Sequence, residues 1–171
     1  GNIGIGHVRY PTAGSEDRAL AQPMYVNSPY GISISHNGNL TNSEELTSTL
    51  VNKNLRHLNT DSDSEVLLNV FAYELQKEGS IKPTAEDIFR AVRATHKRIR
   101  GAYSVVIMIN GVGIVGFRDP CGIRPLILGS KENDLLGKDF MIASESTVLS
   151  SLGFEVLSAT WIKLKLLLVI L

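Results

Sequence analysis

One segment constrains the fold more than any other, because it cannot lie on the surface. Residues 102–109 read Ala-Tyr-Ser-Val-Val-Ile-Met-Ile, an almost continuous apolar and β-branched run. A strand with one face in water alternates apolar and polar residues, whereas an unbroken run is typical of a strand buried on both faces. The rest of the chain must therefore supply layers that cover this strand.

The segments around this strand indicate the fold class. Polar openings at residues 41–44 and 62–65 match capping boxes, and residues 84–87 begin a third helical pattern. The first helix is expected to end near Asn54. Strands are predicted at residues 3–10, 30–36, 102–109, 112–117, 125–128 and 140–143, and a short helix at 144–152. Strands, then helices in series, then strands joined by tight turns indicate an α+β fold with antiparallel sheets covered by helices.

Composition narrows the classes of partner. The 171 residues are enough for one domain with a substantial core. The formal net charge is zero, so no nucleic acid and no membrane partner is expected. The basic residues at 96–100 suit a helix C-terminus better than a binding patch. The single cysteine, Cys121, excludes a disulfide within the chain and favours a reducing compartment, the cytoplasm.

Two familiar patterns do not support the sites that they suggest. Residues 111–116 match G-x-G-x-x-G, but Pro120 soon follows and no helix begins there. A glycine-rich hairpin is therefore favoured over a dinucleotide site. The histidines, at positions 7, 36, 57 and 96, lack the spacing of metal ligands, so no metal site is expected.

Asn37 and Gly38 are the centre of the candidate chemistry. Asn-Gly is suited to positive φ, so a sharp turn is predicted at the end of the strand at 30–36. Such a turn brings main-chain N–H groups and the Asn37 amide into one small space, where they can stabilise an oxyanion. The alternative is a plain hairpin turn with no chemical role.

Two charged residues add clamps to this hypothesis. Arg9 ends the strand at 3–10, where its guanidinium suits a carboxylate ligand or a structural pair with an Asp. Asp61 or Asp63, near a helix start, holds an amine or caps the helix. A carboxylate clamp, an amine clamp and an oxyanion hole together describe a site for a free amino acid with a reactive side-chain carbonyl. Glutamine fits that description.

These segments resemble the glutaminase domain of class II glutamine amidotransferases, which are N-terminal-nucleophile hydrolases. Within that class, residues 6–14 and 117–126 resemble the amidophosphoribosyltransferase family, and residues 22–31 resemble its eukaryotic members. The match extends over residues 3–157. The resemblance implies a four-layer αββα sandwich of two mainly antiparallel sheets, here in truncated form.

The resemblance assigns roles to matching residues. Asn37 and Gly38 would form the oxyanion hole, and Asp63 would hold the α-ammonium of glutamine. Arg9 and Thr12 would bind its α-carboxylate.

Two matching segments would have no direct part in the chemical step. Tyr10 would line the substrate site. Residues 118–126 would pack between the sheets without a catalytic role, although they contain Cys121.

The family also implies parts that these 171 residues lack. Its nucleophile is a cysteine at the mature N-terminus, whereas this chain begins at Gly1, so a preceding segment is expected and the chain alone is expected to be inactive. Cys121 lies mid-chain, has no free α-amine, and is not expected to substitute. A phosphoribosyltransferase domain would bind phosphoribosyl pyrophosphate with Mg²⁺, and no cofactor is expected here.

The complete protein would release ammonia from glutamine and make 5-phosphoribosylamine in de novo purine synthesis, as a homo-oligomer. Residues 1–157 are interpreted as a partial glutaminase domain. Residues 158–171 are a divergent apolar tail, either a buried strand or sequence foreign to the fold. The alternatives are another class II amidotransferase with a different ammonia acceptor, and a non-catalytic amino-acid-binding module.

Overall fold

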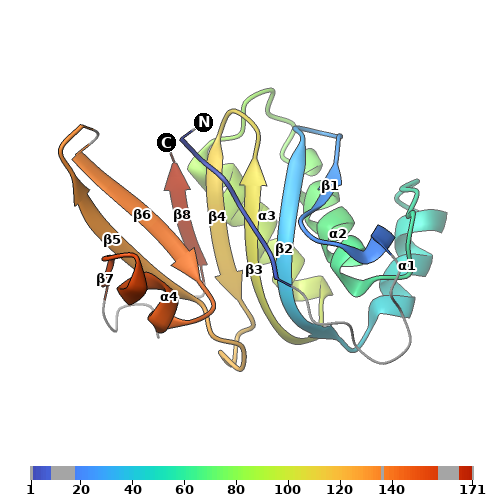
Figure 1. The fold of residues 1–171 in the computed structure, drawn as a ribbon. Coiled ribbons are helices and arrows are strands. Elements are labelled where there is room, and N and C mark those ends of the chain that lie inside the picture. Colours follow the sequence, from blue (N-terminus) through green and yellow to red (C-terminus); the bar gives the residue numbers. More distant parts are fainter. Residues whose placement is uncertain (1, 9–17, 136, 158–165, 171) are drawn as a thin grey trace.

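The computed structural model describes residues 2–8, 18–135, 137–157 and 166–170 (Figure 1). Its helices are the short 3-10 helix η1 Arg18–Leu20 and the α-helices α1 Ser43–Asn52, α2 Asp63–Lys77, α3 Ala85–Arg98 and α4 Ser146–Ser151. Its strands are β1 Met24–Val26, β2 Ile32–Leu40, β3 Gly101–Ile109, β4 Gly113–Arg118, β5 Ile127–Asn133, β6 Gly137–Ala143, β7 Glu155–Val156 and β8 Leu166–Ile170. None of the helices among these residues is long and apolar enough to cross a lipid bilayer.

The strands form two antiparallel sheets, in the orders β1-β2-β3-β4-β8 and β6-β5-β7. Helices α1, α2 and α3 lie on one face of the larger sheet (Figure 1). A β-carbon placed on Gly116 of β4 would lie 3.0 Å from Cδ1 of Ile142 in β6, so the two sheets face each other. A β-carbon on Gly129 of β5 would lie 3.1 Å from Cδ1 of Leu149 in α4. The layers therefore follow the order helices, sheet, sheet, helix.

The apolar run at 102–109 is confirmed as a central strand, β3, paired with β2 on one side and β4 on the other. Tyr103, Val105, Ile107 and Ile109 are each at most 1% exposed and pack in the core beneath the helices. On the opposite face, Val106 and Met108 are only half-buried, and Val106 lines the space between the sheets.

One strand prediction near the N-terminus is wrong. The described residues 2–8 of the predicted strand at 3–10 have no strand pairing and instead run across the face of the larger sheet (Figure 1). The Ser35 hydroxyl donates to the Gly6 carbonyl over 3.4 Å. Gly4 and Gly6 have no side chains to pack against neighbouring strands, which weakens a strand. Residues 9 and 10 lie outside the described part.

The predicted turn at Asn37-Gly38 is also wrong, because β2 continues through both residues to Leu40. Gly38 has a φ of +135°, which glycine adopts readily, so positive φ is accommodated inside the strand. Its partner in β3 is Tyr103, and Leu40 pairs with Gly101, whose φ is +140°. A β-carbon on Gly38 would lie 2.0 Å from the Ala102 carbonyl oxygen.

The three long helices form where the sequence predicts, but two predicted capping boxes do not. The Asn42 side chain bonds the Arg98 carbonyl and the Arg100 N–H instead of capping α1. Before α2, the Ser62 hydroxyl accepts from the Ser64 N–H, while the Glu65 carboxylate turns away. It accepts instead from the main-chain and side-chain groups of Asn59 and Thr60.

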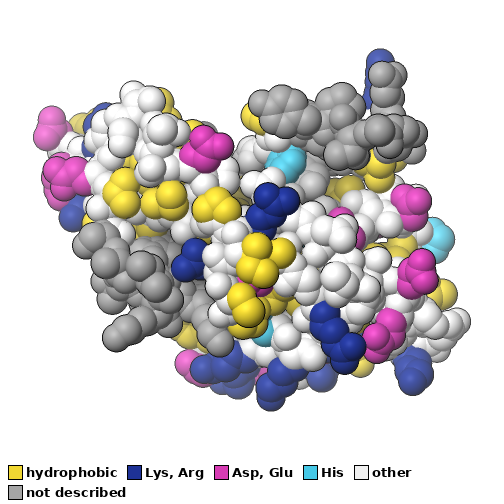
Figure 2. Space-filling model, turned by 90° about the horizontal axis from the view of Figure 1, so that it is seen from below, with side chains coloured by type: hydrophobic (Ala, Val, Ile, Leu, Met, Phe, Trp, Pro, Cys, Tyr) yellow, Lys and Arg dark blue, Asp and Glu magenta, His cyan; other side chains and the backbone are white. Residues whose placement is uncertain are grey.

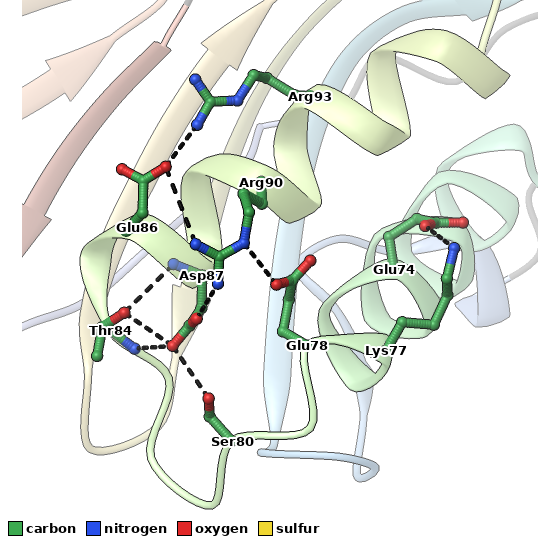
Figure 3. A network of polar contacts seen from close by, with 9 residues as sticks. All are labelled: Glu74, Lys77, Glu78, Ser80, Thr84, Glu86, Asp87, Arg90 and Arg93. Carbon is green, nitrogen blue, oxygen red and sulfur yellow. Dashed lines mark hydrogen bonds and ion pairs between the residues drawn. The ribbon is translucent and has the colours of Figure 1, made fainter.

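A polar network joins the end of α2 to the start of α3 (Figure 3). Thr84 and Asp87 form a capping box, and the Asp87 carboxylate also accepts from the Ser80 hydroxyl at 3.1 Å. Arg90 links this cluster to α2, because its Nε lies 2.7 Å from Glu78 while another guanidinium nitrogen contacts Asp87. The network fixes the angle at which the chain enters α3.

The link from one sheet to the other is held by a buried carboxylate. Asp119 follows β4, is 1% exposed, and accepts main-chain N–H bonds from Tyr103, Cys121, Ile123 and Arg124. Burial alone would raise the pKa of Asp119, but the bonds from Ile123, Arg124, Tyr103 and Cys121 outweigh it and hold the pKa below its usual value.

Residues 111–116 form the turn and first part of the β3–β4 hairpin, as predicted. The described part of the apolar tail, β8, pairs antiparallel with β4. A strand is therefore observed for 166–170, whereas residues 158–165 and 171 lie outside the described part. The boundary at residue 157 stays a prediction.

Replacing Gly38 with Ala is expected to lower the free energy of unfolding by at least about 3 kcal/mol. The new β-carbon would collide with the β3 backbone, which cannot move aside without breaking the ladder. Urea denaturation of the purified protein measures this loss. Gly111→Ala is the matched control, because φ is +71° there but, apart from the chain neighbours, no heavy atom of the described residues would lie within 4 Å of the added β-carbon. It should cost only about 1–2 kcal/mol, and equal losses would contradict the role of the close approach.

Replacing Asp119 with Asn is expected to lower the free energy of unfolding at pH 7 by about 1.5–3 kcal/mol, because hydrogen bonds to a charged acceptor are lost. The folded-state pKa is depressed, so this stabilisation is present above the unfolded pKa and is lost as pH falls through the folded pKa. The difference between Asp119→Asn and the parent protein should therefore shrink in acid. Asp61→Asn, at an exposed position, is the control. A difference that is constant with pH would contradict this assignment.

Candidate functional site

A broad cavity of about 1690 Å³ lies between the two sheets. Asn37 and Gly38 of β2 and Ser104 of β3 line one wall, and residues of β6 line the other. Figure 2 views the molecule from the end where β4 leads into the second sheet, and Lys and Arg side chains lie there beside hydrophobic ones. The predicted oxyanion residues therefore face a space large enough for a small-molecule substrate.

The alternation along β2 explains why Asn37 faces this cavity. Ile32, Ile34 and His36 point toward the helices and are at most 3% exposed. Successive side chains of a strand point to opposite faces, so Asn37 points to the other side and is exposed. Gly38 follows with its unusual φ, which turns its peptide groups away from the regular strand geometry.

The structure brings Asp63 to the same end of β2. It is the first residue of α2, and its Oδ2 accepts from the Leu40 N–H at 2.9 Å. Its Oδ1 lies 3.9 Å from Nδ1 of His36, and the side chain keeps 21% of its surface exposed. Asp63 is not the helix cap, because Ser62 holds that position. The carboxylate thus lies at the end of β2 that carries Asn37 and Gly38, although Asp63 is not among the described residues that line the cavity.

Two polar residues behind this strand, Gln22 and Ser64, could not be identified from the sequence. The Gln22 side chain accepts from the His36 N–H at 2.7 Å and donates to the His36 carbonyl at 3.3 Å. Its amide also donates to Ser64 Oγ at 3.1 Å, which lies 2.9 Å from Nδ1 of His36. No periodic pattern marks such contacts, because they join side chains and backbone from distant segments.

His36 is buried among these groups. Burial lowers the pKa of His36, the nearby Asp63 carboxylate opposes this, and His7 and Arg124 lower it further. The lowered pKa favours the neutral imidazole at pH 7. Its Nε2 is buried without a hydrogen-bond partner among the described residues. The geometry makes His36 an inward-facing anchor of the strand, because the cavity lies on the opposite face.

Three predicted substrate-binding residues, Arg9, Tyr10 and Thr12, lie outside the described residues, and their roles stay predictions. Cys121 is exposed in the turn after β4, and its main-chain N–H donates to Asp119 at 3.0 Å. Its nitrogen is therefore an amide and cannot act as an amine base. Within the described ranges, no three His, Cys, Asp or Glu side chains gather in a metal-binding group.

The sequence profile of a family described as "Glutamine amidotransferase domain" matches residues 12–151. Amidophosphoribosyltransferases from Pseudomonas aeruginosa and Escherichia coli K12 are 59% and 57% identical over 157 residues, which is 92% of this chain and 31% of each relative. The enzyme of Schizosaccharomyces pombe is 54% identical over 91% of this chain and 29% of its own length. The chain thus spans about a third of the length of these relatives.

Two solved structures share the fold. One is glutamine phosphoribosylpyrophosphate amidotransferase from Bacillus subtilis, described as a complex with ADP and GMP, with a TM-score of 0.66 and 27% identity over 88% of this chain and 29% of that one. The other is described as the allosteric regulatory enzyme of purine biosynthesis, with a TM-score of 0.68 and 29% identity over 88% of this chain and 30% of that one.

These matches confirm the predicted α+β fold of the N-terminal-nucleophile hydrolase type. The profile covers most of the chain, including Asn37, Gly38 and Asp63. The chain therefore belongs to the glutamine amidotransferase domain family, and its curated relatives there are amidophosphoribosyltransferases.

Proposed function

We propose that this chain provides the glutamine-binding and oxyanion-stabilising part of a glutaminase site. The observation that carries the proposal is the juxtaposition of Asn37 and Gly38, on the cavity wall, with the Asp63 carboxylate at the end of the same strand. Donors and a carboxylate on one rigid strand and one helix start are suited to hold an amino acid in a fixed orientation.

In the proposed mechanism, a cysteine thiolate attacks the side-chain carbonyl carbon of glutamine, and an electron pair moves onto the carbonyl oxygen. The Asn37 amide and the Gly38 N–H donate hydrogen bonds to this oxyanion. When the pair returns, the C–N bond breaks and the leaving nitrogen takes up the proton that the free α-amine of the cysteine removed from the thiol. Ammonia leaves and a thioester remains. Water then cleaves the thioester and releases glutamate.

Asp63 is proposed to bind the α-ammonium of the substrate through Oδ1. Its Oδ2 already accepts from the Leu40 N–H, and this bond fixes the orientation of the carboxylate. The exposed fraction of 21% leaves the side chain accessible to a ligand. Arg9 and Thr12 are proposed to bind the α-carboxylate, and Tyr10 to line the site.

The whole protein is proposed to transfer the ammonia to phosphoribosyl pyrophosphate, forming 5-phosphoribosylamine. Its relatives are named amidophosphoribosyltransferases, which supports this acceptor. Mg²⁺ and phosphoribosyl pyrophosphate are proposed to bind to a phosphoribosyltransferase domain of the whole protein. A cytoplasmic homo-oligomer is part of the same proposal.

Replacing Asn37 with Ala in the full-length protein is expected to lower kcat for glutamate release by about 10²–10³-fold, because an oxyanion donor is lost. KM for glutamine should change little, since the bond strengthens only in the transition state. Steady-state kinetics of glutamine hydrolysis measures both constants. Asn52→Ala, on the exposed surface of α1, is the matched control. A rise in KM with unchanged kcat would show that Asn37 only binds substrate.

The 171-residue chain by itself is expected to release no glutamate above the blank. Its single cysteine, Cys121, has its nitrogen in a peptide bond and has no free amine to activate the thiol. Incubating the purified chain with glutamine and measuring glutamate tests this expectation, with the full-length protein as the positive control. Turnover at an enzyme-like rate would contradict it.

A further inference from the structure

The side chain of Gln22 occupies the position where the next main-chain pair between β1 and β2 would form. Strands β1 and β2 pair as Met24↔Ile34, Tyr25↔Ser33 and Val26↔Ile32. Continuing this antiparallel register past Met24 places residue 22 opposite His36. The described β1 begins only at Met24, so the main-chain ladder stops before that rung.

The Gln22 amide replaces the missing rung with the same two kinds of bond. Its Oε1 accepts from the His36 N–H at 2.7 Å, and its Nε2 donates to the His36 carbonyl at 3.3 Å. One side-chain amide therefore binds both main-chain groups of the residue directly before Asn37. The N–H and the carbonyl of His36 are therefore both hydrogen-bonded at the edge of β2 that β1 leaves unpaired.

The same amide reaches the start of α2. Nε2 of Gln22 also lies 3.1 Å from Ser64 Oγ, and this hydroxyl lies 2.9 Å from Nδ1 of His36. Ser64 is 3% exposed and directly follows Asp63, whose carboxylate binds the Leu40 N–H. Strand β2 and helix α2 are thus joined on both sides of Asn37, through Gln22 before it and through Asp63 after it.

We propose that Gln22 is a positioning residue for the oxyanion hole. It holds the peptide of His36 so that Asn37 presents its amide to the cavity at a fixed depth and angle. Gln22 does not line that cavity among the described residues, so it acts through Asn37. This inference rests on the proposed glutaminase function.

The test is a double-mutant cycle in the full-length protein. Gln22→Met keeps a side chain of similar length but removes all three hydrogen bonds, and it should lower kcat for glutamate release by roughly 10- to 100-fold through misplacement of Asn37. KM for glutamine should stay within about threefold. In the Asn37→Ala background, the same change should cost less than about threefold in kcat, because nothing remains to be positioned.

Two further variants separate positioning from a loss of folding. Gln22→Glu keeps the acceptor for the His36 N–H but cannot donate, and its kcat should fall by about 3- to 10-fold, between those of the parent protein and Gln22→Met. Gln76→Met, at an exposed position of α2 where the side chain accepts a hydrogen bond from Arg56, should leave kcat unchanged. If Gln22→Met does not fold, Gln22→Glu carries the cycle alone.

Several outcomes would overturn the proposal. They are an unchanged kcat in the variant used for the cycle, a change in KM alone, or equal losses of kcat with and without Asn37. The proposed function fails separately, if the parent protein releases no glutamate or if Asn37→Ala leaves kcat unchanged. A parent enzyme that responds to Asn37→Ala but not to the Gln22 variants would leave the function intact and reject only the positioning role.

Discussion

The close approach of β2 to β3 at Gly38 is the constraint on which the rest of the site depends. There is room at this point for a hydrogen atom but none for a β-carbon, since the Ala102 carbonyl oxygen would lie 2.0 Å away. Gly101 repeats the arrangement from the opposite strand, against the Asn39 carbonyl at 2.2 Å. Because both positions are glycine, the two strands can approach closely and adopt positive φ while their pairing continues. Asn37 therefore stays on a rigid strand next to α2.

The elements with strong periodic patterns could be predicted from sequence, and the local details could not. Strand β3 and helices α2 and α3 are confirmed because their burial patterns extend over many residues. The turn at Asn37-Gly38 was wrong because the preference for positive φ is local, and pairing with β3 satisfies it within a strand. The predicted capping boxes at α1 and α2 do not form. The Asn42 side chain binds main-chain groups of Arg98 and Arg100, and the Glu65 carboxylate binds Asn59 and Thr60 in the loop before α2.

The candidate site divides in the same way. Residue types indicate Asn37, Gly38 and either Asp61 or Asp63 as candidates, and the family resemblance selects Asp63. The structure places Asn37, Gly38 and Asp63 at one end of β2. Gln22 could not be identified from the sequence, because a side-chain amide that continues a sheet ladder leaves no spacing or composition signal. The place of Gln22 opposite His36 can be recognised only when the register of β1 and β2 is known.

The two oxygens of Asp63 make different contacts, and this difference suggests a way to detect ligand binding by NMR. Oδ2 accepts from the Leu40 N–H at 2.9 Å, while Oδ1 lies 3.9 Å from Nδ1 of His36 and is the atom proposed to bind the α-ammonium. A positive charge on Oδ1 withdraws electron density from the whole carboxylate and weakens it as an acceptor for Leu40. Under the proposed function, the amide resonance of the buried Leu40 would therefore report whether a cationic ligand occupies Asp63, because both bind the same carboxylate.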